Sequence, residues 1–152
     1  MITLGPRSQA AMRGVHPDLI GVIKRAASIA TPSQDFTVLE GVRTREKMCE
    51  NWGKGRTAAE CTAHGVAASY ARPNEKKVTW LANPFNSNHA VKSDGYGHAV
   101  DLAPWPIDWN DAARFNDLAR IVLASALEER VKIVWGGMWH SSPDLPHFEL
   151  QS

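Results

Sequence analysis

The sequence has only two cysteines, no excess of either charge and no long hydrophobic run. Cys49 and Cys61 form no Cys-x-x-Cys motif. Either reduced or paired thiols are compatible with that spacing, but a chain of this length does not need a disulfide, so we expect reduced structural thiols. Seventeen basic and sixteen acidic residues leave a formal charge of +1, which gives no broad attraction for nucleic acid. No segment is long and apolar enough for membrane insertion.

Residues 1–8 contain no charged region followed by an apolar stretch, so no signal peptide is expected and synthesis is predicted in the cytoplasm. The length of 152 residues suits one domain with a sizeable core. No repeat, low-complexity tract or linker divides the chain. We therefore expect residues 1–152 to form one domain.

Hydrophobic periodicity predicts an α+β fold with a small, mostly antiparallel sheet and helices packed against one side. Apolar spacing of three and four indicates helices, while short apolar or alternating runs between turn residues indicate strands. The expected helices are 17–30, 45–52, 58–64 and a long one from Asp108 or Asn110 to about 130. Thr44 is expected to cap the second of them, and Thr57 with Glu60 to form a capping box at the start of the third. The expected strands are 36–39, 78–81, 99–102, 131–135 and 147–150.

Two separated segments carry the candidate chemistry. The first is Ser87-Asn88-His89, followed by Gly97-His98-Ala99-Val100-Asp101. If residues 99–102 are extended, Ala99 and Asp101 point to one face of the sheet and Val100 and Leu102 to the other. The second segment is Asp144-Leu145-Pro146-His147-Phe148-Glu149-Leu150. In its terminal strand, Phe148 and Leu150 are expected to face the core, and His147 and Glu149 to face away from it. Two histidines and one aspartate from such segments can form a three-ligand zinc site with a fourth position open for water.

Several other residues offer weaker candidates for the same roles. His98 precedes Asp101 by three and would face the opposite side of a strand, so we interpret it as a neighbour of the site. His140 could line a cleft, while His16 and His64 lie at predicted helix ends. Ser87 lacks the Gly-x-Ser-x-Gly pattern of a nucleophile and is expected to position the loop or the substrate by hydrogen bonding. The cysteines have no adjacent activating residue.

Five ordered motifs give the chain a family resemblance. These motifs resemble those of the D-alanyl-D-alanine carboxypeptidase family of zinc peptidases, and within it the bacteriophage endolysins that act as L-alanyl-D-glutamate endopeptidases. The resemblance extends over nearly the whole chain and implies the hedgehog-like α+β fold of that family. The motifs are Glu40-Gly41-Val42-Arg43-Thr44, Ser87-Asn88-His89, Gly97-His98-Ala99-Val100-Asp101, Trp135-Gly136-Gly137 and Asp144-Leu145-Pro146-His147-Phe148.

The resemblance implies a role for each matching residue. One zinc ion per chain would be held by His89, Asp101 and His147. Asp144 would be the general base, and Arg43 would meet the substrate carbonyl or its developing oxyanion. Further substrate contacts are expected from Ser87, Arg43, His98 and Trp139; Trp105, Trp109 and Trp135 also lie near the motifs.

The chain departs from the family pattern at two places. About five extra residues, Lys92 to Tyr96, lengthen the segment between His89 and Gly97 and are expected to form a loop at the rim of the cleft. Met138 stands where many relatives carry aspartate after Trp-Gly-Gly. This difference is expected to affect the details of substrate recognition more than metal binding.

The resemblance also implies a biological setting. The expected enzyme is a monomer without a separate wall-binding domain, acting on the peptide stem of peptidoglycan in the periplasm after release through a phage holin. Two other functions remain open. One is a D-alanyl-D-alanine carboxypeptidase or dipeptidase with the same zinc centre, and the other is a non-catalytic zinc-containing binding module.

Overall fold

The computed structural model describes residues 1–152, and the chain separates into two compact units. The first unit comprises Met1–Val42 and Val91–Ser152, and the second comprises Arg43–Ala90. All four strands belong to the first unit, and the second is built from helices and loops. The expectation that residues 1–152 act as one catalytic domain with no wall-binding domain stays a prediction.

The first unit is built on a four-stranded sheet whose strands run in the order β1-β2-β4-β3. Every neighbouring pair is antiparallel, so the predicted α+β class and antiparallel sheet are confirmed. The strands are β1 (Phe36–Glu40), β2 (Ala99–Pro104), β3 (Ile133–Trp135) and β4 (His147–Leu150).

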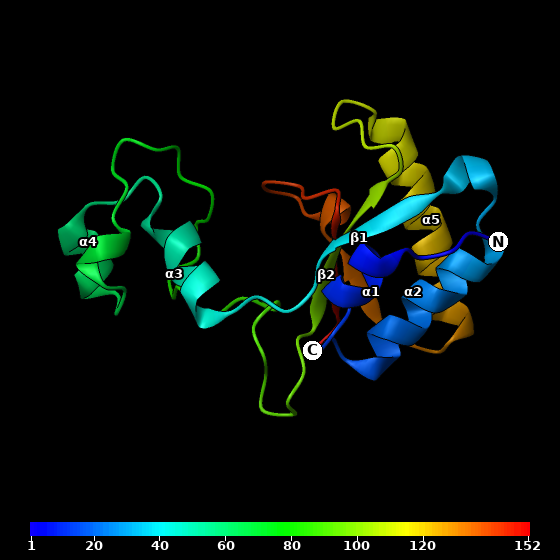
Figure 1. Ribbon diagram of the computed structural model, residues 1–152, viewed down its shortest axis with the longest axis horizontal. Helices are drawn as coiled ribbons and strands as arrows, with labels where there is room; N and C mark the ends of the chain where they lie inside the picture. Colours follow the sequence, from blue (N-terminus) through cyan, green and yellow to red (C-terminus); the bar gives the residue numbers. More distant parts are fainter. The chain divides into compact units, whose positions relative to one another are not determined.

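Two long helices, α2 (Pro17–Ile29) and α5 (Ala112–Glu128), lie side by side and cover one face of this sheet (Figure 1). Their apolar faces pack on alternate residues of the strands, as the period of two in a strand requires. The buried residues that form this core on the sheet include Phe36, Val38, Val100, Leu102 and Phe148, and those from the helices include Leu19, Val22, Ile23, Ala26, Leu118, Ala119, Val122 and Ala126.

A short helix that the sequence did not predict, α1 (Pro6–Ala11), supports the edge strand β1. The buried Ser8 hydroxyl accepts a hydrogen bond from the Val38 backbone N–H at 3.0 Å and pairs with the Thr37 hydroxyl at 3.1 Å. Six residues are too few for an amphipathic pattern to stand out in sequence. Three 3₁₀ turns complete the element list: η1 (Pro32–Gln34), η2 (Ala68–Tyr70) and η3 (Gly136–Met138).

The second unit contains α3 (Arg45–Gly53) and α4 (Ala58–Ala63), and both begin at the predicted caps. The Thr44 hydroxyl accepts from the Lys47 N–H, and Thr57 with Glu60 forms a complete capping box. This unit has its own small core, to which both cysteines contribute as free, buried thiols. The core residues are Cys49, Trp52, Cys61 and Val66.

The expected strand 78–81 is wrong, because the second unit contains no strand with which it could pair. Its carbonyl groups bind side chains instead. The Thr79 carbonyl accepts from an Arg56 guanidinium N–H at 2.8 Å, and the Leu81 carbonyl accepts from Trp52 Nε1 at 2.9 Å. Side-chain donors thus satisfy the hydrogen-bonding capacity of these two backbone carbonyls without a neighbouring strand.

Two predicted boundaries near the long helix also differ. Helix α5 begins after Asp111, whose carboxylate accepts from the Arg114 N–H, and not after Asp108 or Asn110. Strand β3 begins at Ile133, two residues later than predicted, because the Val131 N–H still closes the end of the helix on the Ala126 carbonyl.

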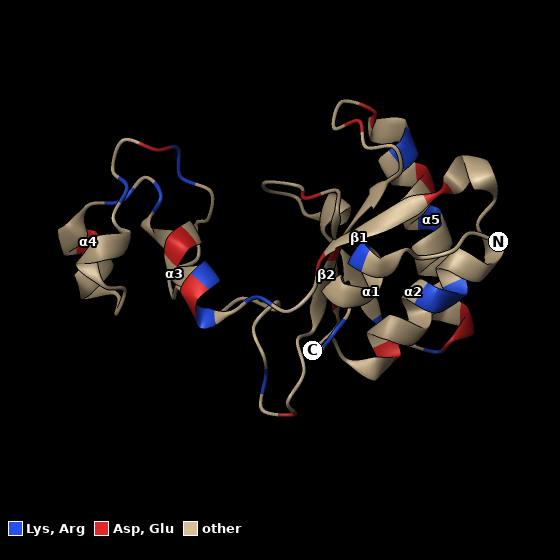
Figure 2. Ribbon diagram, viewed as in Figure 1, with Lys and Arg blue, Asp and Glu red and all other residues tan.

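Charged residues of both signs are interspersed along helices α2 and α3, as Figure 2 shows. This distribution agrees with the near-zero net charge of the chain. No helix in the structure combines the length and low polarity required to cross a bilayer.

Candidate metal centre

The register of β2 against β4 brings two of the predicted ligands together. Asp101 and His147 are directly opposite each other in the antiparallel pair, and their side chains share the face of the sheet turned away from the helical core. We call this face, with Ala99, Asp101, His147 and Glu149, the site face. The neighbours Val100 and Phe148 point into the core, as the sequence alternation predicted. Asp101 Oδ1 and His147 Nδ1 are 3.2 Å apart.

The third predicted ligand, His89, completes a group of three. One ligand atom from each of His89, Asp101 and His147 lies within 4.8 Å of the other two. The histidines are almost fully buried, with relative exposures of 3% and 7%. The sequence motifs therefore identified the three side chains that come together.

His147 is held by carboxylates at both ring nitrogens. Nδ1 faces Asp101, and Nε2 lies 2.8 Å from the carboxylate of Glu149, two residues further along β4. Burial acts to lower the pKa of His147, but the hydrogen bonds to Asp101 and Glu149 outweigh it and raise that pKa to about 9. The carboxylates of Asp101 and Glu149 thus stabilise a positive charge on the His147 ring.

The chemistry of the three side chains fits a divalent metal ion of the zinc type. Two imidazoles and one carboxylate are ligands that such ions accept, and a set of three leaves one tetrahedral position free. Two ligand atoms of one tetrahedral zinc ion lie about 3.3 Å apart, which the 3.2 Å between Asp101 Oδ1 and His147 Nδ1 matches.

Asp144 lies in the turn that precedes β4, and this turn is fixed by a segment whose role the sequence did not reveal. The Asp144 N–H donates to the Gly136 carbonyl at 2.9 Å, and Trp135 Nε1 donates to the Leu145 carbonyl at 2.7 Å. A Cβ added to Gly136 would lie 2.5 Å from the Asp144 carbonyl oxygen and 3.1 Å from the Cβ of His147. The Trp-Gly-Gly motif therefore holds the backbone that carries Asp144 and His147.

Arg43 and Ser87 belong to the second unit and both contact the backbone of His89. The Arg43 N–H donates to the His89 carbonyl at 2.8 Å. The buried Ser87 hydroxyl accepts from the His89 N–H at 3.2 Å, which supports the expected loop-positioning role. These contacts fix the main chain on both sides of the predicted ligand.

Trp139 packs against the predicted ligand His147, with ring centroids 5.1 Å apart, and remains 36% exposed. An aromatic surface thus borders the candidate centre. Trp135, by contrast, stacks on Phe148 and belongs to the partly buried residues around the core.

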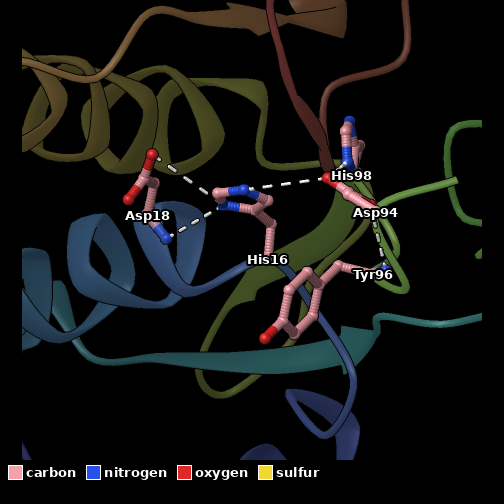
Figure 3. A network of polar contacts seen from close by, with 5 residues as sticks. All are labelled: His16, Asp18, Asp94, Tyr96 and His98. Carbon is pink, nitrogen blue, oxygen red and sulfur yellow. Dashed lines mark hydrogen bonds and ion pairs between the residues drawn. The ribbon is translucent and has the colours of Figure 1, made fainter. Parts of the chain in front are cut away.

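His98 is not a member of the three-ligand group, and it joins a polar network with the predicted insert (Figure 3). Its Nε2 lies 2.7 Å from the Asp94 carboxylate, and that carboxylate also lies 3.8 Å from Nε2 of His16. The Lys92 N–H donates to the Tyr96 carbonyl, so the insert closes on itself as a tight loop. His98 holds this loop, and its expected substrate contact stays a prediction.

The remaining histidines have local roles. His16 caps α2 by accepting the Asp18 N–H through Nδ1, and His64 bonds the Glu60 carbonyl at the end of α4, as their positions at helix ends predicted. His140 is exposed in an irregular segment.

Comparisons with known proteins find similar families and a similar structure. A family model described as D-alanyl-D-alanine carboxypeptidase matches residues 82–150, and one described as phage L-alanyl-D-glutamate peptidase matches residues 1–71. The crystal structure of the L-Ala D-Glu endopeptidase ChiX of Serratia marcescens is similar, with a TM-score of 0.62 and 29% sequence identity over 96% of this chain and 87% of that chain. No curated protein sequence matches the chain.

Proposed function

We propose that the chain is a metallopeptidase of the D-alanyl-D-alanine carboxypeptidase type, a zinc-dependent endolysin that hydrolyses the L-alanyl-D-glutamate bond in the peptide stem of peptidoglycan. One observation carries the proposal: His89, Asp101 and His147 gather their ligand atoms within 4.8 Å. The match to phage L-alanyl-D-glutamate peptidases and the likeness to ChiX favour this bond over others in the stem.

His89, Asp101 and His147 would hold one zinc ion per chain. When bound, zinc supplies Lewis acidity, which activates water and polarises a peptide carbonyl. Burial of both histidines keeps bulk water from the ligands and strengthens electrostatic interactions there. Trp139, packed on His147, would border the position of the scissile peptide.

Asp144 would move the protons of the reaction. Its carboxylate takes a proton from the attacking water as the new C–O bond forms, and then passes that proton to the amide nitrogen as the C–N bond breaks. The turn that carries Asp144 is anchored on Gly136 and ends at His147, which keeps the base beside a metal ligand. A base fixed in this way loses little entropy when the substrate binds.

Arg43 would stabilise the negative charge that develops on the carbonyl oxygen. A guanidinium is always charged and offers several N–H donors, so it suits an oxyanion. The hydrogen bond from its backbone to His89 keeps Arg43 next to a predicted ligand. Ser87 and His98 are proposed to add substrate contacts beside their structural hydrogen bonds.

The experiment compares Asp144→Asn with Asp108→Asn, a matched change at an exposed loop aspartate. Purified protein loaded with Zn²⁺ is incubated with sacculi, and the products are identified by mass spectrometry. We expect cleavage between L-alanine and D-glutamate, and a rate about 10²–10⁴-fold lower for Asp144→Asn with zinc content unchanged. Equal rates for both variants, or intact sacculi with metal-loaded wild type, would contradict the proposal.

The description of the model that matches residues 82–150 favours a second candidate, a D-alanyl-D-alanine carboxypeptidase or dipeptidase. The same mass analysis separates the two activities, because a carboxypeptidase releases free D-alanine and leaves the L-alanyl-D-glutamate bond intact. A non-catalytic zinc-containing module would cut neither bond.

We further propose that the protein acts as a monomer in the bacterial periplasm, after synthesis in the host cytoplasm and release through a phage holin. The match to a phage peptidase model supports this setting. Size-exclusion chromatography with light scattering tests the oligomeric state, and lysis of cells that produce the protein with and without a holin tests the route.

A further inference from the structure

Glu149 stands out on the site face because it contacts a predicted ligand without belonging to the three-ligand group. Strand periodicity puts it on the same face as His147, two residues earlier in β4. In the register of β2 and β4, Glu149 is opposite Ala99 while His147 is opposite Asp101. Ala99 is small and buried, so it offers no polar group across the strand pair.

The two ring nitrogens of His147 face different carboxylates. Nδ1 lies 3.2 Å from Asp101, a hydrogen-bond distance that is also the spacing of two atoms that bind one metal ion, and Asp101 is itself a predicted ligand. Nε2 lies 2.8 Å from Glu149, which is the spacing of a charge-assisted hydrogen bond. When a neutral imidazole binds a metal through one ring nitrogen, its other ring nitrogen carries the proton.

We infer that Glu149 is a positioning residue, which accepts a hydrogen bond from Nε2 of His147 and thereby makes Nδ1 the metal-binding atom. The inference rests on the proposed zinc site, but it does not require that peptidoglycan is the substrate. A carboxylate in this position fixes the tautomer and ring orientation of a metal-binding histidine and raises the basicity of the ligating nitrogen. Its side chain is 18% exposed, so the hydrogen bond is only partly shared with water.

Wild-type protein tests the geometry first. With ¹⁵N-labelled histidine and bound Zn²⁺, two-bond ¹H–¹⁵N correlation spectra should show a protonated Nε2 and a metal-bound Nδ1 for His147, assigned by comparison with His147→Ala. A metal-bound Nε2 would overturn the inference. This measurement does not depend on the folding of a Glu149 variant.

Variants test the energetic role. Loss of such a partner lowers metal affinity by about 10–100-fold, so we expect that decrease for Glu149→Ala in Zn²⁺ competition with a chromophoric chelator. Glu149→Gln, whose amide oxygen can still accept from Nε2, should restore most of the affinity. Glu128→Gln, which removes a carboxylate paired with Arg25, is the matched control and should leave affinity unchanged.

The outcomes separate the two proposals. Co²⁺ absorption spectra of the variants add a readout of coordination geometry, and a shifted d–d spectrum in Glu149→Ala with a wild-type spectrum in Glu149→Gln supports orientation by the hydrogen bond. Wild-type Zn²⁺ affinity in Glu149→Ala would overturn the inference while leaving the peptidase proposal intact. A wild-type protein that binds zinc through Nδ1 but cuts no peptidoglycan would contradict the peptidase proposal and leave the inference about Glu149 intact.

Discussion

Replacing Gly136 by alanine should disturb the candidate centre although Gly136 is not a proposed ligand or catalytic group. The added methyl group would lie 2.5 Å from the Asp144 carbonyl oxygen, and real Cβ atoms essentially never approach below 3.0 Å. The turn must therefore move by at least about 0.5 Å, and the two further contacts, with the Cβ atoms of His147 and Asp144, leave it little room.

The size of the effect follows from that overlap. Overpacking a close contact costs about 1–3 kcal/mol, which corresponds to a decrease in Tm of roughly 2–4 °C per kcal/mol for a chain of this length. A displacement that approaches 1 Å in a group that must meet the substrate can lower the rate by about 10²-fold. We therefore expect a loss of activity larger than the loss of stability would suggest.

Gly21→Ala is the matched control, because it is the same chemical change at a position in α2 with no atom within 4 Å of the added Cβ. Alanine in a helix interior is favoured over glycine by about 1 kcal/mol, so this variant should gain stability. Differential scanning calorimetry, Zn²⁺ competition and cleavage of sacculi are measured for both. If Gly136→Ala matches wild type in all three, the turn is not held as we argue.

Three further predictions address other parts of the first unit. His147→Ala should abolish stoichiometric zinc while His98→Ala keeps it in metal analysis of purified protein; full zinc in His147→Ala would refute the ligand assignment. Ser8→Ala should lower the free energy of unfolding in urea by about 1–3 kcal/mol, because the Val38 N–H loses its acceptor; an unchanged value would show another acceptor. The hydrogen bond with His98 lowers the pKa of Asp94, so this contact stabilises the native state at pH values above the ordinary carboxyl pKa. The stabilisation is lost as the pH falls through the lowered pKa of Asp94. Asp94→Asn should therefore unfold more easily than wild type near neutral pH, and the difference should disappear in acid.

The sequence predicted the parts of the fold that depend on local pattern. Strand periodicity predicted that Asp101 faces away from Val100 and that His147 faces away from Phe148 before any register was known, and the register places Asp101 and His147 on one face. Capping residues located the starts of α3 and α4. The family motifs then identified His89, Asp101 and His147 together, which the structure brings within reach of one another.

Features that depend on tertiary contacts could not be read from the sequence. The segment 78–81 has strand-forming residues, but whether it pairs depends on a neighbouring strand, and Arg56 binds its carbonyl instead. The role of Gly136 depends on a turn eight residues later in the chain. Glu149 was placed on the correct face, but only the contact at Nε2 of His147 indicates a partner for the ligand.

The alternation in β4 means that one short peptide specifies both the interior and the chemistry of the first unit. His147 and Glu149 face the centre, and Phe148 faces the helices. Deletion of one residue just before this strand would exchange the two faces, so a phenyl ring would replace an imidazole and a charged group would enter the core. A change of length there is therefore expected to abolish both folding and zinc binding, whereas the self-closed loop Lys92 to Tyr96 can vary in length without changing which face of β2 carries Asp101.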